Sequence, residues 1–181
     1  MNTFPVPTRD TVSTANQPLF DALKGKLGMV PNLYATLAHS EHALGTYLAL
    51  QSAKTSLSPR EREVINLVVS QVNDCAYCLA AHTVLGGLNG FSPDQISDIR
   101  AGCAPFDARL DALARFTRRT AELRGKPGTE AVDALLVAGF TRENVVDIVV
   151  AIGDKIITNY LHGVTNVPID FPVAPALTQA A

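Results

Sequence analysis

Three segments of this chain begin with a helix-capping sequence and continue into an apolar run. Residues 58–61 read SPRE, residues 92–95 read SPDQ, and Thr141 is followed by an arginine and a glutamate. In such sequences a serine or threonine side chain accepts a hydrogen bond from the first helical turn, and proline at the first helical position loses no hydrogen bond. The sequence therefore predicts helices that begin close to residues 59, 93 and 142.

The rest of the chain also carries helix patterns. Apolar residues recur at helical spacing from Val145 to Leu161, and Gly163 is expected to end that helix. Further helices are predicted at 18–27, 32–38, 41–55, 61–72, 75–85, 108–123 and 129–137. No stretch alternates apolar and polar residues as a half-buried strand does. We expect an all-α fold, a compact helical bundle with irregular proline-containing ends, in a single domain over residues 1–181.

Composition argues against several classes of partner. The chain has 15 basic and 17 acidic residues, a formal net charge of −2, and 47% apolar residues. Because no basic stripe is present to neutralise phosphates, we expect no nucleic-acid partner. No leader sequence and no run of about 18 apolar residues is visible, so we expect no membrane contact and a cytoplasmic location. Apolar helices with extended arms leave faces to cover, which favours a homo-oligomer.

Two of the three cysteines, Cys75 and Cys78, have Cys-x-x-Cys spacing. In a reducing compartment this spacing indicates redox or metal chemistry rather than a structural disulfide. Asn73 and Asp74 are good helix caps, which would put Cys75 in a first turn, where free N–H groups and the helix dipole lower a thiol pKa. His82 lies one helical turn beyond Cys78 on the same face, where an imidazole can take or return the thiol proton.

Glu63 lies on the preceding predicted helix, twelve residues before Cys75. In an unbroken helix the two would be roughly 18 Å apart, too far for proton exchange. The chain must therefore reverse near residues 73–74 for the carboxylate to reach the Cys78 and His82 face. We treat these four residues as the candidate catalytic group, and expect the remaining Cys103 to be a small buried side chain.

The run over residues 57–83 resembles the core signature of the alkyl hydroperoxidase D family, within the carboxymuconolactone decarboxylase superfamily. That signature is a glutamate, eleven intervening residues, a Cys-x-x-Cys pair and a histidine four positions further on. Glu63, Cys75, Cys78 and His82 fill it without a gap. The resemblance implies an all-helical fold, associated subunits, and no bound metal or organic cofactor.

The resemblance also implies a role for each residue. Cys78 would attack an organic hydroperoxide, and Cys75 would resolve the sulfenic acid to a disulfide. Glu63 would pass a proton through water to His82. An external dithiol such as dihydrolipoamide or thioredoxin would restore the thiols. Tyr77 stands where the best-studied members have a histidine, and we expect it on the exposed side of the turn, as a packing residue or pocket lid.

The runs 30–33 and 167–170 are similar to those of the peroxidase-related branch of the family, so the resemblance covers most of the chain. Three alternatives remain open. The four candidate residues could bind zinc instead of exchanging electrons. The chain could be a decarboxylase or isomerase acting on a lactone acid, as other members of the superfamily are. It could also be a redox-sensing or binding module without turnover. Steady-state consumption of an organic hydroperoxide would separate the peroxidase from the last two.

Overall fold

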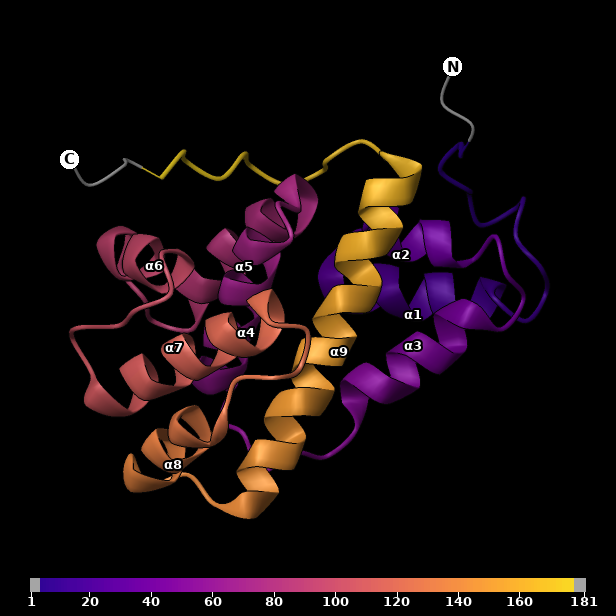
Figure 1. The fold of residues 1–181 in the computed structure, drawn as a ribbon. Coiled ribbons are helices and arrows are strands. Elements are labelled where there is room, and N and C mark those ends of the chain that lie inside the picture. The colour runs from indigo at the N-terminus through magenta and orange to yellow at the C-terminus, as the bar shows by residue number, and fades with distance from the viewer. Residues whose placement is uncertain (1–3, 178–181) are drawn as a thin grey trace.

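The computed structural model describes residues 4–177, and all the regular secondary structure in that range is α-helical (Figure 1). The helices are α1 (Gln17–Leu27), α2 (Asn32–Leu37), α3 (Ala43–Ser52), α4 (Pro59–Val72), α5 (Ala76–Leu88), α6 (Pro93–Arg100), α7 (Ala108–Glu122), α8 (Thr129–Val137) and α9 (Arg142–Thr165). The prediction of an all-α fold is confirmed. None of these helices is long and apolar enough to cross a membrane.

The three capping sequences start helices as predicted. Ser58 and Ser92 each form a capping box, with a glutamate and a glutamine respectively in the third helical position. Thr141 forms the same device with Asn144, which the sequence analysis did not identify as its partner. The expected end at Gly163 is wrong, because α9 continues to Thr165 and stops only where Asn166 takes a left-handed conformation.

α4 is the central helix, in contact with α5, α6, α7 and α9. Apart from Val72, its β-branched side chains are almost fully buried, so α4 is buried on most sides. Figure 1 shows α9 crossing the molecule, with α1 to α3 on one side and α4 to α8 on the other. A large apolar cluster joins α4 with α6 to α9, and a smaller one joins α1 to α3. The active-site candidates lie where these two parts meet.

The segment after α9 is extended and packs on its own chain. Arg100 donates a hydrogen bond to the Pro175 carbonyl at 2.7 Å. The Asp170 carboxylate accepts the Asn32 backbone N–H at 2.7 Å. Val167 and Phe171 join an apolar cluster that contains both motif cysteines. The C-terminal arm is therefore a strap across the start of α2 and α5.

Candidate active site

The turn between α4 and α5 brings the candidate residues together. Asp74 adopts a left-handed conformation with φ of 49°, and the Cys75 N–H donates to the Ser70 carbonyl at 2.9 Å. The reversal predicted near residues 73–74 is thus present, and α5 runs back along α4. The prediction that Asn73 and Asp74 cap α5 is wrong. Cys75 itself is the N-cap residue, and its sulfur accepts the N–H of Cys78 at 3.4 Å.

A buried chain of polar groups joins α4, α5 and α9. Glu63 Oε2 lies 2.8 Å from His82 Nδ1, and Glu63 Oε1 accepts from Asn66 Nδ2 at 3.1 Å. On the other side of the ring, Lys155 Nζ lies 2.7 Å from His82 Nε2. The carboxylate thus contacts the imidazole directly, without the intervening water that the resemblance implied. Although burial would raise the pKa of Glu63, the hydrogen bond with His82 and the charge of Lys155 hold it below its usual value.

The two cysteines have opposite environments. The Cys75 side chain hydrogen-bonds the Cys78 sulfur and, against the effect of burial, lowers the pKa of Cys78 to about 5, with further help from the charge of Lys155. The same hydrogen bond to Cys78, together with burial, raises the pKa of Cys75. At neutral pH the pair therefore consists of a Cys78 thiolate and a Cys75 thiol, and the thiolate is the nucleophilic form of a cysteine.

A cavity of about 650 Å³ lies beside this pair, within the usual size range for small-molecule pockets. Cys78, His82 and Lys155 contribute to its wall, whereas Cys75 does not. The rest of the wall is mostly apolar and comes from α1, α2, α3, α5 and the C-terminal strap, including Leu19, Leu23, Leu33, Leu48, Val84 and Phe171. A molecule bound in this cavity would therefore contact Cys78 rather than Cys75.

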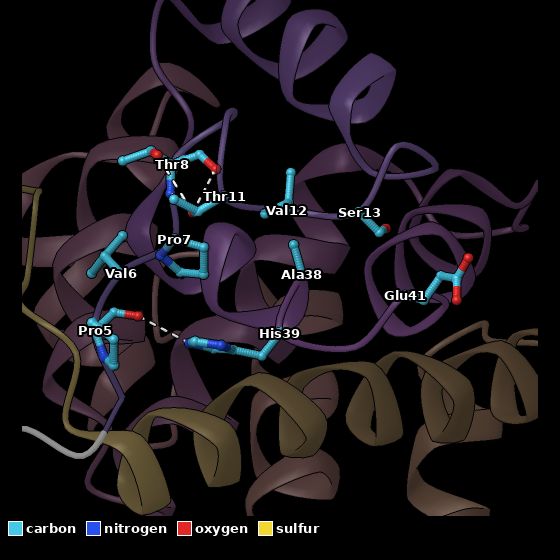
Figure 2. A pocket seen from close by; sticks show the side chains of 10 residues that line it. All are labelled: Pro5, Val6, Pro7, Thr8, Thr11, Val12, Ser13, Ala38, His39 and Glu41. Atoms are coloured by element: carbon cyan, nitrogen blue, oxygen red, sulfur yellow. Dashed lines mark hydrogen bonds between the residues drawn. The ribbon is translucent and has the colours of Figure 1, made fainter.

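A second cavity of about 480 Å³ lies between the N-terminal arm and the end of α2 (Figure 2). In Figure 2 the His39 ring reaches the Pro5 carbonyl, at 2.9 Å. None of the four candidate residues lines this cavity, and neither does a cysteine. The cavity is therefore separate from the four candidate residues, and the N-terminal arm also packs on its own chain.

Tyr77 was expected to be exposed, but it is buried, with only 3% of its surface accessible to solvent. Its hydroxyl donates to Asp170 Oδ1 at 2.5 Å and accepts the Leu33 N–H at 3.2 Å. The ring packs edge-on against Phe171, and both rings line the cavity beside Cys78. The tyrosine between the cysteines therefore ties the C-terminal strap to the start of α5, and its expected packing role agrees with this position.

Two polar residues of α9 were missed by the sequence analysis. Lys155 contacts His82 as described above, and Asn159 donates to the Ser70 hydroxyl at 3.3 Å while accepting from Asn73 Nδ2 at 2.9 Å. The sequence did contain one signal for Lys155. Asp154 and Lys155 stand in the middle of an apolar helical run, and charged residues are rarely buried unless they are paired. Both members of that pair are buried.

Cys103 lies outside this group of side chains. Cys103 was expected to be buried, but it is half-buried. Its sulfur contacts the Asp98 carbonyl at 3.5 Å. Within residues 4–177, no three His, Cys, Asp or Glu side chains are arranged to hold a metal ion.

Known proteins with this fold include peroxidase-related proteins. The chain is similar to an uncharacterized peroxidase-related protein from Silicibacter sp. TM1040, with 26% identity, a TM-score of 0.80, and coverage of 92% of this chain and 89% of the other. It is similar to another from Ralstonia eutropha JMP134, described as an alkylhydroperoxidase AhpD core, with 22% identity, a TM-score of 0.83, and coverage of 92% and 91%. A variant of the debrominase Bmp8 in complex with 2,3,4-tribromopyrrole shares the fold at 15% identity, with a TM-score of 0.76 and coverage of 94% and 93%.

The family comparison covers the candidate site itself. The model of the carboxymuconolactone decarboxylase family matches residues 39–119, a range that contains all four candidate catalytic residues. A search of curated proteins gave no match. The family match and the shared fold agree with the resemblance stated from residues 57–83. Over residues 39–119 the chain is similar to the carboxymuconolactone decarboxylase family, and it shares its fold with peroxidase-related proteins.

Proposed function

We propose that this protein is a thiol-dependent peroxidase that reduces organic hydroperoxides. The observation that carries the proposal is the asymmetry of the cysteine pair. Cys78 lies in the wall of a largely apolar cavity and has a lowered pKa, whereas Cys75 lies outside that wall and has a raised pKa. A thiolate facing a cavity and a thiol directly behind it are the arrangement that a peroxide-attacking and a resolving cysteine require.

The reaction has three balanced steps. The Cys78 thiolate attacks the terminal oxygen of the hydroperoxide, so that an S–O bond forms, the O–O bond breaks, and the alkoxide leaves and takes up a proton. The Cys75 thiol then attacks the Cys78 sulfenic acid, which forms the disulfide and releases water. An external dithiol, for which dihydrolipoamide and thioredoxin are the candidates, reduces the disulfide and is itself oxidised to a disulfide.

The apolar cavity favours an organic substrate over hydrogen peroxide. Its wall offers mostly leucine and aromatic carbon, so an alkyl or aromatic group on the hydroperoxide would bury apolar surface, at roughly 25 cal/mol per Å². A peroxide without such a group would gain nothing from that wall. Cumene hydroperoxide is therefore a suitable test substrate.

Steady-state consumption of cumene hydroperoxide with a dithiol tests the proposal. We expect the wild-type protein to turn over, the Cys78→Ser variant to be inactive, and the Cys103→Ser variant to match wild type, because Cys103 lies outside the site. Turnover that survives in Cys78→Ser would refute the assignment. Disulfide formation by the wild type without turnover under any dithiol would favour a redox-sensing module instead.

We also propose that the protein is a homo-oligomer. α9 carries a set of exposed apolar side chains on one face: Val146, Val149, Val150, Ile157, Tyr160 and Val164. Apolar faces of this kind are usually covered in soluble proteins, most often by a second copy in a symmetric assembly. Sedimentation velocity at micromolar concentration should show a species larger than one chain, and a monomer alone would contradict this.

A further inference from the structure

Lys155 is a buried ammonium group whose donors are only partly used. Only 3% of the residue is accessible, and it lies in the cavity wall together with Cys78 and His82. A lysine ammonium has three N–H groups. Among the residues that the structure describes, the Lys155 ammonium has one hydrogen-bond partner, His82 Nε2. Burying a cation is costly unless its donors are satisfied, so the remaining N–H groups of Lys155 are available to an acceptor in the cavity.

The neighbouring histidine cannot supply the proton that the alkoxide needs. Glu63 as a carboxylate can only accept, so His82 Nδ1 carries a hydrogen and donates it to Glu63. His82 Nε2 is then a lone-pair acceptor for the Lys155 ammonium. In this arrangement the ring is neutral and both its nitrogens are engaged. Of the three groups, only Lys155 offers a free N–H beside Cys78.

We propose that Lys155 is the general acid of the peroxide step, an inference that rests on the proposed peroxidase function. Its ammonium binds the oxygen that leaves and gives it a proton as the O–O bond breaks. The alcohol is released and Lys155 is left as a neutral amine. When the external dithiol reduces the disulfide, it delivers two protons: one remains on Cys75 as the thiol and the other returns to Lys155. The Cys78 thiolate is then restored, and the cycle is balanced.

The position of Lys155 serves the thiolate as well. Its positive charge is one of the groups that lower the pKa of Cys78. The same ammonium would therefore stabilise negative charge first on sulfur and then on the leaving oxygen, which is how preorganised donors accelerate reactions in dry sites. Glu63 and His82 act as positioning residues, since they fix the orientation of the ammonium and hold its counter-charge.

The choice of oxidant separates proton donation from a structural role. The leaving group of cumene hydroperoxide is an alkoxide, which needs a proton. The leaving group of peracetic acid is acetate, which does not. We would measure single-turnover oxidation of Cys78 by each oxidant at fixed pH and divide each rate by the thiolate fraction, taken from ultraviolet absorbance. Lys155→Met should slow the cumene hydroperoxide reaction by roughly 100-fold or more, the usual scale for lost acid catalysis, and slow peracetic acid by less than about tenfold.

Two further variants support this comparison. Lys24→Met removes an exposed cation on α1 that does not line the cavity, and should match wild type with both oxidants. Lys155→Arg keeps the positive charge, but a guanidinium does not release a proton at neutral pH. It should preserve a low Cys78 pKa while leaving the cumene hydroperoxide reaction slow, and it carries the test if Lys155→Met does not fold.

The outcomes distinguish this inference from the proposed function. If the wild-type protein oxidises Cys78 with neither oxidant, the peroxidase proposal fails and this inference fails with it. If the wild type reacts with both oxidants and Lys155→Met slows them equally, or slows neither, the peroxidase proposal stands and Lys155 is not the acid. A wild-type rate with cumene hydroperoxide in Lys155→Arg would also overturn the inference.

Discussion

Replacing Glu63 by glutamine keeps the size of the side chain but removes the charge that the buried His82 contacts. The two carboxylate oxygens now accept from His82 Nδ1 at 2.8 Å and from Asn66 Nδ2 at 3.1 Å. Glutamine has a single carbonyl oxygen, so its NH₂ group would face one of these two donors. If His82 took the other tautomer, its Nε2–H would face the Lys155 ammonium, so a donor would again lack an acceptor.

The magnitude follows from this mismatch and from the lost charge. A buried donor without an acceptor costs about 1–3 kcal/mol, and leaving a buried charge without its counter-charge, here the Lys155 ammonium, costs about 3–5 kcal/mol. We expect the free energy of unfolding of Glu63→Gln to fall by about 3–5 kcal/mol, which lowers Tm by roughly 6–20 °C for a chain of this size. Peroxide turnover should fall by roughly 100-fold or more, because the His82 and Lys155 pair loses its orienting charge.

Glu61→Gln is the matched control, since Glu61 and Glu63 lie on the same helix and are 8% and 7% accessible. Glu61 accepts the Ser58 N–H at 2.8 Å and pairs with the partly exposed Arg109 at 3.0 Å. Glutamine can maintain a capping box, so this variant should lose no more than about 1 kcal/mol. Thermal unfolding and steady-state turnover measured on both variants decide the matter. Equal turnover in the two would remove Glu63 from the mechanism.

Three further predictions concern the cysteines and the strap. Peptide mass mapping after treatment with an organic hydroperoxide should find a Cys75–Cys78 disulfide and a free Cys103; a disulfide that includes Cys103 would contradict the site. Alkylation of Cys78 by iodoacetamide should speed up as the pH rises through about 5 and then level off, because only the thiolate reacts; a midpoint near 8.5, the value for an ordinary thiol, would count against the proposed environment. Tyr77→Phe removes the hydrogen bond to Asp170, so hydrogen exchange over residues 167–177 should increase; unchanged exchange would mean that the strap is held by other contacts.

The sequence predicted the helices because their starts are encoded locally. A serine, a proline and a glutamate or glutamine within four residues specify a helix start with little help from the rest of the chain, and the starts near 59 and 93 lie where these patterns put them. The cap of α5 was mispredicted for a related reason. Several residues near 73–75 can serve as caps, and the choice of Cys75 depends on the left-handed turn at Asp74.

The parts of the site that were missed depend on contacts between distant segments. Lys155 and His82 are 73 positions apart, and only the packing of α9 against α4 and α5 brings them together. Tyr77 was expected at the surface because its buried partner, Asp170, lies 93 positions away on the C-terminal strap. No local pattern reports either contact. The position of Glu63 beside His82, in contrast, followed from one inferred chain reversal.

The central claim, that Cys78 is the thiol that attacks the peroxide, can be tested directly by trapping the sulfenic acid. In the Cys75→Ser variant the resolving thiol is absent, so cumene hydroperoxide should leave a sulfenic acid at Cys78 that dimedone labels and mass spectrometry locates. In the converse Cys78→Ser variant, Cys75 should remain unlabelled because its pKa is raised and it does not line the cavity. Labelling of Cys75 in the converse variant, with Cys78 unlabelled in the first, would contradict the account.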